Sequence, residues 1–224
     1  MVRNNFYRKV YLLRSGNSTG TCFGLYIDEE EYFVTAKHVV EHLGSEGRVF
    51  LFHDGGWKYA DAKIYHHQNP KIDISILKLH KRVIPNPLDV NYTLGDIAHG
   101  QDTYFLGFPY QIFSNAAKHI NADYPMPFAK KGICSLITHQ NKITTVYLDG
   151  HNNPGFSGGP VCFKNFKTNE LHIGAVISAY RLNHPQAIID KNNEEQELYY
   201  RENAGIIISY DIKHAFEIIN EQAT

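Results

Sequence analysis

The segment Asn153–Pro160 places a serine among three glycines and two prolines, directly before the apolar residues Val161–Phe163. A nucleophilic serine needs a tight turn on which its hydroxyl and nearby backbone N–H groups face one point. Gly155 has no Cβ, so it can adopt the positive φ that turns an N–H inward. The segment predicts Ser157 as a nucleophile, with the N–H groups of Gly155 and Ser157 as an oxyanion hole. The alternative is a glycine-rich surface turn with an incidental serine.

A base and an acid lie upstream of this serine. His38 ends the segment Thr35–His38, which follows a short β-rich run, and Asp73 begins the alternating segment Asp73–Leu79. A serine hydroxyl is a weak nucleophile unless a histidine takes its proton and an acid orients that histidine. The order His38, Asp73, Ser157 is that of chymotrypsin, whereas subtilisins and α/β-hydrolases use other orders.

Six segments of the chain together resemble the trypsin-like (chymotrypsin-fold) serine peptidases, and most closely the protease domain of the HtrA/Deg group. Asp149–Pro160 matches the family's Asp-x-x-x-Asn-x-Gly-x-Ser-Gly-Gly-Pro without a gap, and Thr35–His38 resembles its Thr-Ala-x-His. The other four segments are Asp73–Leu77, Leu106–Pro109, Lys131–Ser135 and Ala204–Ser209. Each carries little information alone, but six in the right order are specific.

The resemblance implies an all-β protein of two six-stranded antiparallel β-barrels (chymotrypsin-like) with a C-terminal helix. We expect a single peptidase domain over residues 1–224, with the first barrel over about 1–90, the second over about 100–210 and the helix over 211–222. Asp211 is the expected N-cap of that helix. No second domain is visible, so we expect no PDZ module of the kind usual in HtrA proteins.

The local pattern adds three expectations about individual segments. β-Branched and aromatic residues predict a first strand over Phe6–Leu13. The segment Gln111–Ala129 is long and contains two prolines, so we expect a flexible loop near the active site there. Arg181–Asn203 is mostly polar and is expected to be a loop whose acids are solvated.

The implied function is that of a serine endopeptidase that works through an acyl-enzyme, needs no cofactor and has a polypeptide as its partner. By resemblance, His151 and Asn152 lie at the base or wall of the primary pocket, and Ser178 and Tyr180 lie on the strand that pairs with the substrate backbone. His151 is not an acid, so a preference for Lys or Arg is not expected. A polar pocket would suit a polar or acidic side chain.

Composition excludes several other classes of function. The net charge is −1, so there is no basic excess to suggest nucleic acid. No segment approaches the ~20 apolar residues that would span a membrane, and the N-terminus has no apolar core of signal-peptide length. The cysteine count of three, an odd number, argues against a disulfide framework, and we expect Cys22, Cys134 and Cys162 to be buried thiols. These observations predict a cytoplasmic protein.

Two rival functions remain open at this stage. His38–His42 is H-x-x-E-H, a pattern of some zinc peptidases, which would need a helix to put both imidazoles on one face. His66 and His67 are more simply explained as exposed loop residues than as metal ligands. The other rival is a catalytically weak or inactive pseudoprotease that binds peptides on the same fold.

Phe156 bears on activation. In secreted trypsins an aspartate directly before the nucleophile pairs with a new N-terminus and orders the oxyanion turn, but Phe156 carries no charge. An α-ammonium buried beside it without a partner would be costly. We therefore expect no N-terminal processing, with order in the turn coming from packing of Phe156 and from neighbouring loops.

Overall fold

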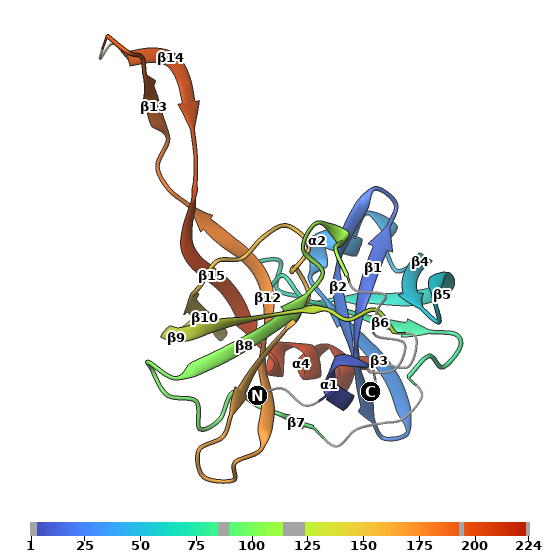
Figure 1. The fold of residues 1–224 in the computed structure, drawn as a ribbon. Helices are drawn as coiled ribbons and strands as arrows, with labels where there is room; N and C mark the ends of the chain where they lie inside the picture. The colour runs from blue at the N-terminus through green and yellow to red at the C-terminus, as the bar shows by residue number, and fades with distance from the viewer. Residues whose placement is uncertain (1–3, 85–89, 114–123, 193–194, 223–224) are drawn as a thin grey trace.

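The computed structural model describes residues 4–84, 90–113, 124–192 and 195–222. Most of these residues form β-strands, and the strands close into two six-stranded antiparallel barrels of the chymotrypsin-like type (Figure 1). A C-terminal helix, α4 (Lys213–Gln222), packs where the barrels meet. Asp211 Oδ1 accepts a hydrogen bond from the N–H of Lys213 at 3.0 Å, which is the expected capping contact.

The first barrel has the strand order β1-β2-β3-β6-β5-β4 and closes through pairing of β1 with β4. Its β2–β3 hairpin turns at Asp28 and Glu29, both of which have positive φ, as a two-residue turn between twisted strands requires. The strands are β1 (Val10–Ser15), β2 (Ser18–Ile27), β3 (Glu30–Thr35), β4 (Glu46–His53), β5 (Gly56–His66) and β6 (Ser75–Leu79).

The second barrel has the order β11-β8-β9-β10-β15-β12 and closes through pairing of β11 with β12. A short strand, β7 (Asn91–Tyr92), adds to β12 in parallel. The six barrel strands are β8 (Asp102–Gly107), β9 (Phe128–Gln140), β10 (Ile143–Asp149), β11 (Pro160–Lys164), β12 (Leu171–Leu182) and β15 (Asn203–Asp211).

Three apolar clusters hold the molecule together, one inside each barrel and one between the barrels. The cluster between the barrels contains Ala215, Ile218 and Ile219 of α4 together with residues of both barrels. All three cysteines are buried thiols. No helix in the described part of the chain is long and apolar enough to cross a membrane.

Two local predictions were wrong. Phe6 and Tyr7 belong to a short helix, α1 (Asn4–Tyr7), and the first strand starts only at Val10, because β pairing with β2 begins there. The second error is the polar loop over Arg181–Asn203. Instead, β12 runs on to Leu182, and a second hairpin of β13 (Gln186–Ile189) and β14 (Glu195–Tyr200) follows. Polarity misled the analysis because both faces of this hairpin are exposed.

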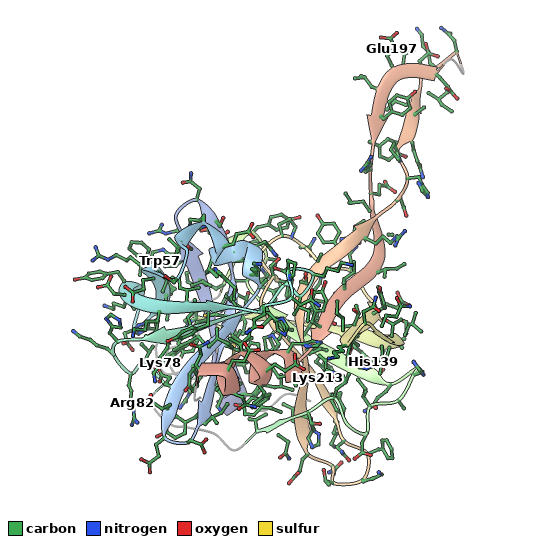
Figure 2. All side chains as sticks on the ribbon, turned by 180° about the vertical axis from the view of Figure 1, so that it is seen from behind. Trp57, Lys78, Arg82, His139, Glu197 and Lys213 are labelled. Carbon is green, nitrogen blue, oxygen red and sulfur yellow. The ribbon has the colours of Figure 1, made fainter. Side chains whose placement is uncertain are left out.

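We call residues 183–202 the arm. It projects away from both barrels as a two-stranded ribbon, and Glu197 lies near its far end (Figures 1 and 2). The expected flexible loop over Gln111–Ala129 falls largely on residues 114–123, which lie outside the described residues. At its two ends the chain is ordered as the 3₁₀ turn Pro109–Gln111 and the start of β9.

Candidate active site

His38 and Asp73 meet because their elements leave two neighbouring strands at the same end. β3 ends at Thr35, which pairs with Ser75 at the start of β6. His38 follows β3 on a single-turn helix, α2 (Lys37–Val40), and Asp73 comes two residues before Ser75. The antiparallel register therefore fixes the separation of the two side chains.

Two hydrogen bonds join His38 to Asp73. The backbone N–H of His38 donates to Asp73 Oδ1 at 2.9 Å, and Nδ1 of the ring lies 2.7 Å from Oδ2. Burial alone would raise the pKa of Asp73, but hydrogen bonds from His38 and Ser178 outweigh it and hold that pKa below its usual value. The carboxylate is therefore ionised and can only accept, so Nδ1 carries the proton and Nε2 is left as a free base.

The hydrogen bond to Asp73 also raises the pKa of His38, an effect that partial burial of the ring opposes. The imidazolium that would form on proton uptake is thus stabilised by the adjacent carboxylate. Close to half of the His38 side chain is exposed, 47%, so its Nε2 edge remains open to a substrate.

Ser178 connects the acid to the serine. Its hydroxyl donates to Asp73 Oδ2 at 2.6 Å, and its carbonyl oxygen accepts a hydrogen bond from Ser157 Oγ at 3.2 Å. We had expected Ser178 only as part of the strand that pairs with substrate; its contact with Asp73 was missed because no sequence spacing links residues 105 positions apart. Although both residues are described, no hydrogen bond joins Ser157 Oγ to His38 Nε2 in this conformation.

The turn before Ser157 has the shape that the glycines predict. Gly155 has φ +106°, and the N–H of Phe156 closes the turn by donating to the carbonyl of Asn153 at 3.3 Å. A Cβ on Gly155 would collide with the carbonyl oxygen of Phe108, so only glycine fits. Within the described residues, the N–H groups of Gly155 and Ser157 take part in no hydrogen bond, which leaves both free for an oxyanion.

Phe156 packs under this turn and lies near the ammonium group of a half-buried lysine, Lys130. The Phe156 ring is fully buried and lies edge-on to Phe105, with 5.1 Å between ring centroids. Lys130 Nζ lies 5.7 Å from the Phe156 centroid and donates to the carbonyl of His151 at 2.6 Å and to Asn153 Oδ1 at 2.8 Å. Desolvation lowers the pKa of Lys130. The sequence does not single out Lys130, because it is one lysine among others on a strand.

A pocket of about 400 Å³ lies beside the turn. It contains His151, Asn152 and Tyr180, which were expected at the primary pocket or the substrate strand. Asn152 is buried and its Oδ1 has no hydrogen-bond partner among the described residues. Its backbone carbonyl accepts from Asn203 Nδ2 at 2.6 Å. The remaining lining residues, which the sequence did not indicate, are Tyr110, Asn153, Pro154, Glu202 and Asn203.

The H-x-x-E-H pattern does not form a metal site. His38 bonds to Asp73, whereas Nε2 of His42 lies 3.1 Å from Ser15 Oγ, so the two imidazoles serve different partners. The short helix α2 ends at Val40 and a 3₁₀ turn follows, so the two histidines do not sit on one long helix as such a site requires.

A different group, His67, His214 and Glu217, has side-chain ligand atoms within 4.8 Å of one another. His67 is half-buried, not an exposed loop residue as expected. The rings lie with His67 Nε2 and His214 Nδ1 on Glu217 Oε2, at 2.9 and 2.7 Å. The other ring nitrogens accept backbone N–H groups of Asn69 and Thr144. If a metal bound the two ring nitrogens that face Glu217, the other nitrogen of each neutral ring would carry a proton and could not accept a backbone N–H. The group therefore fits a hydrogen-bonded cluster better than a metal site. We call His67, His214 and Glu217 the clasp.

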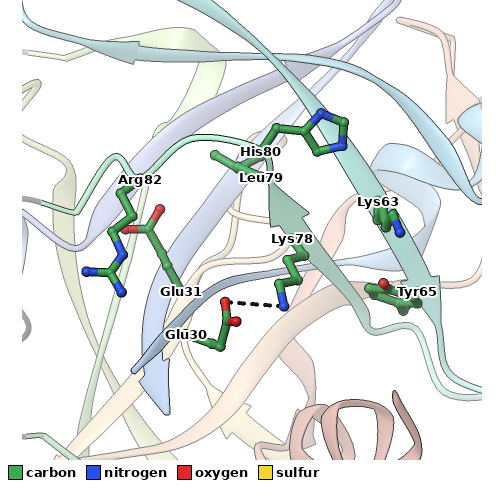
Figure 3. Close-up of a pocket in the computed structure, with 8 residues that line it drawn as sticks. All are labelled: Glu30, Glu31, Lys63, Tyr65, Lys78, Leu79, His80 and Arg82. Atoms are coloured by element: carbon green, nitrogen blue, oxygen red, sulfur yellow. Dashed lines mark ion pairs between the residues drawn. The ribbon is translucent and has the colours of Figure 1, made fainter. Parts of the chain in front are cut away.

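Another cleft, of about 430 Å³, lies on the first barrel and contains none of the candidate catalytic residues (Figure 3). Both of its carboxylates already have partners. Lys78 lies 3.2 Å from Glu30, and Glu31 accepts the N–H groups of Val83 and Ile84. No serine, threonine or cysteine is among the described residues that line the cleft.

Comparison with solved structures gives the same fold. The chain is similar to the HtrA-type protease AlgW with a tripeptide (TM-score 0.61, 17% identity, 97% of this chain and 62% of that chain). It is also similar to an inactive mutant form of Rv3671c from M. tuberculosis H37Rv (0.58, 14%, 96% and 87%) and to a serine endoprotease from Yersinia pestis (0.58, 16%, 97% and 63%). The chain thus spans about three fifths of the length of the HtrA-type neighbours.

Sequence comparison gives one match. The model of the trypsin-like peptidase domain matches residues 20–169, a segment that contains His38, Asp73 and Ser157. No curated protein sequence matches the chain significantly.

Proposed function

Because the chain belongs to the trypsin-like peptidase domain family, we propose that it is a serine endopeptidase that uses Ser157, His38 and Asp73. One observation carries this proposal. The hydrogen bonds of Asp73 leave Nε2 of His38 unprotonated, and Ser178 links Asp73 to Ser157, a serine on a turn with two free N–H groups. That arrangement combines a nucleophile, a base and an oxyanion hole.

The chemistry follows from these roles. Ser157 Oγ attacks the carbonyl carbon of the scissile peptide bond while His38 Nε2 takes its proton. The negative charge that develops on the carbonyl oxygen is stabilised by the N–H groups of Gly155 and Ser157. His38 then donates the proton to the leaving amine, and an acyl-enzyme forms. Water, activated by the same imidazole, hydrolyses the ester and restores Ser157.

The hydroxyl of Ser157 must move before attack. It donates to the carbonyl of Ser178 in this conformation, and attack requires that it turn to His38 instead. Catalytic hydrogen bonds are often long in free enzymes and shorten when substrate binds. We propose that substrate binding at the Ser178 strand competes for that carbonyl and releases the hydroxyl.

The pocket favours a polar, uncharged side chain before the scissile bond. The unpaired Oδ1 of Asn152 can accept from an amide or hydroxyl group. Glu202 at the pocket opposes a carboxylate, and the ammonium of Lys130, bonded to the pocket carbonyl of His151, opposes a second cation. Cleavage of a peptide library, with products sequenced by mass spectrometry, tests this; a dominant Lys or Arg preference would contradict it.

The decisive test of the function is the Ser157→Ala variant. We expect its kcat on peptides to fall by about a million-fold, as when the nucleophile of a serine peptidase is removed. A fluorophosphonate should label wild-type Ser157 and not the variant. Ser45→Ala, at an exposed serine, is the matched control and should retain full activity. Near-full activity of Ser157→Ala would remove the assignment.

A peptide-binding pseudoprotease is the second candidate, because Ser157 Oγ bonds to Ser178 and not to His38. In that case fluorophosphonate would leave Ser157 unlabelled at every pH. Peptides would still bind, and binding would quench or shift the fluorescence of the protein. The two candidates therefore differ in labelling, not in binding.

A further inference from the structure

The arm exposes large apolar side chains that nothing in the described chain covers. Leu198 and Tyr199 are each 65% exposed. Ile188, Ile189 and Tyr200 are also exposed. An isolated two-stranded ribbon is marginally stable in water, and its outer edges present unpaired N–H and C=O groups. A ribbon of this composition is suited to binding an additional strand.

The arm is a continuation of the strand that begins at the candidate nucleophile. β12 pairs with β11 only as far as Val176, and beyond that point β15 is its only partner among the described strands. The free edge starts at Ser178, whose carbonyl contacts Ser157. The N–H of Asn183 donates to the carbonyl of Glu202 at 2.8 Å, which carries the pairing from β12 and β15 into the arm. In Figure 1 the two hairpins form one twisted ribbon.

The two faces of the arm differ in charge, while both carry exposed apolar side chains. Gln186 pairs with Tyr200 and Ala187 with Tyr199, and after an irregularity in the register Ile189 pairs with Glu195. Successive residues of a strand face opposite sides, so the even face carries Ile188, Leu198 and Tyr200 with two glutamines and no charge in the paired strands. The odd face carries Ile189 and Tyr199 together with Glu195 and Glu197. Over its described residues the arm has four carboxylates (Asp190, Glu195, Glu197, Glu202) and two cationic side chains (Lys191, Arg201).

We propose that the arm binds the segment of the substrate upstream of the scissile bond, as an added antiparallel strand along the edge from Ser178 to Ile189. This proposal rests on the proposed function. The scissile bond sits at the Ser178 end, so a chain lying antiparallel to β12 extends toward the arm on its N-terminal side, and antiparallel pairing is the more stable arrangement per residue. Such a track accommodates about ten substrate residues at about 3.3 Å each.

The chemistry of the arm defines the class of substrate. Alternating side chains of an extended segment would lie over its exposed isoleucines, leucine and tyrosines, so β-branched and apolar residues at every second position are favoured. The excess of carboxylates disfavours an acidic segment. The preferred substrate is therefore an unfolded or extended polypeptide whose upstream segment is apolar and not acidic.

The test compares three quenched fluorescent peptides with one cleavage site, taken from the library profile. One spans only the site, one is lengthened on the N-terminal side by an alternating Val-Thr segment, and one carries the same segment on the C-terminal side. We expect the N-terminal extension to raise wild-type kcat/KM by about tenfold, since several cross-strand pairs each add modestly. The C-terminal extension should have no effect, and replacing Thr by Glu should abolish the gain.

The enzyme variant removes the arm and keeps its root. Residues 184–201 are replaced by an Asn-Gly turn between Asn183 and Glu202, which are already hydrogen-bonded. This variant should cleave the short peptide as wild type does and lose the gain from the extension. The double substitution Leu198→Ser with Tyr200→Ser should lose part of it. Phe166→Ser is the matched control, because Phe166 is equally exposed but lies outside the arm.

Each outcome decides one proposal. If wild type cleaves the short peptide but gains nothing from the N-terminal extension, or if the gain survives removal of the arm, the arm proposal is wrong and the peptidase assignment stands. If wild type cleaves no peptide and Ser157 is not labelled, both fail. Sedimentation velocity tests whether a second copy of the chain occupies the arm instead of substrate. A wild-type dimer that becomes a monomer without the arm would favour the second copy and contradict the proposal.

Discussion

At the scale of single residues, Lys130 supplies a charge that the family usually obtains elsewhere. Secreted trypsins order the oxyanion turn with an ammonium released by cleavage and an aspartate before the serine. Here that aspartate position is Phe156, and an internal ammonium, Lys130 Nζ, contacts the Phe156 ring and bonds to Asn153 and His151. The turn thus has a cation within the chain, and the absence of N-terminal processing stays a prediction.

This gives a prediction for Lys130→Met, which keeps the aliphatic stem and removes the charge. We expect kcat to fall by about ten- to a hundred-fold, because a hydrogen bond to a charged group contributes about 1.5–3 kcal/mol. Fluorophosphonate labelling of Ser157 should slow to a similar extent, and Lys130→Arg should restore part of both. The control is Lys131→Met, whose ammonium pairs with Asp102 at the surface. Equal effects of the two methionine variants would contradict the assignment.

A second prediction concerns His38 and pH. Because the hydrogen bond to Asp73 raises the pKa of His38, and because only the neutral ring is a base, kcat/KM should rise with pH with a midpoint above the ordinary histidine value of about 6.5. Asp73→Asn should lower kcat by about ten-thousand-fold and shift the midpoint of the residual activity to lower pH. Asp61→Asn, at an acid paired with exposed Arg48, should change neither. An unshifted midpoint in Asp73→Asn would show that Asp73 does not act on His38.

At the scale of elements, helix α4 is tied to the loop that carries Asp73. Glu217 of the helix bonds to His67 at one end of that loop, and Tyr210 Oη of β15 donates to the carbonyl of Lys71 at 2.8 Å. His214 of the helix accepts the N–H of Thr144 and bonds to Glu217. The helix that the sequence predicts as a packing element therefore also holds one end of the loop that carries Asp73.

His214 of the clasp makes the free energy of unfolding depend on pH. Burial lowers the pKa of His214, although Glu217 opposes the shift, so the unfolded chain binds a proton more readily than the folded one. Stability is therefore lost as pH falls below about 6.5 toward the folded-state pKa. Lys213 and Asp211 also act on the ring, in opposite senses.

His214→Gln removes this titration and can still accept the Thr144 N–H. Scanning calorimetry of both proteins at about pH 7.5 and about pH 5.5 should show that the fall in Tm on acidification is smaller in the variant by about 2–4 °C. An equal fall in both proteins would show that folding does not lower the pKa of His214.

Elements could be predicted to different degrees. Strands such as β3, β6 and β8 can be identified because apolar, β-branched and aromatic residues are concentrated in them, and at least half of the residues in each are buried. The arm was mistaken for a loop because neither face is buried and no alternation exists. Lys130 and Ser178 could not be identified from the sequence for a similar reason, because their contacts depend on strands that meet only in the folded chain. The glycines around Ser157, in contrast, predict their turn by composition alone.

At the scale of the whole molecule, the two barrels contribute different parts of the candidate site. His38 and Asp73 follow strands of the first barrel, and Ser157 and Ser178 belong to the second. The motif order was enough to predict two barrels and the three candidate residues. It could not predict the separation of Ser157 Oγ from His38, because that depends on how the barrels pack against each other.

Because the candidate site is divided between the barrels, its geometry depends on how the two barrels are aligned. Near the candidate site, bonds from one barrel to the other include Ser178 to Asp73, Thr21 N–H to Ser157 O and Thr21 Oγ1 to Gly155 O. A small slip between the barrels would therefore misalign His38 and Ser157 while each barrel stays folded. In a urea titration we expect peptidase activity to vanish at a lower concentration than the one at which Trp57 of the first barrel changes its fluorescence. Coincident transitions would mean that the barrels separate only by unfolding.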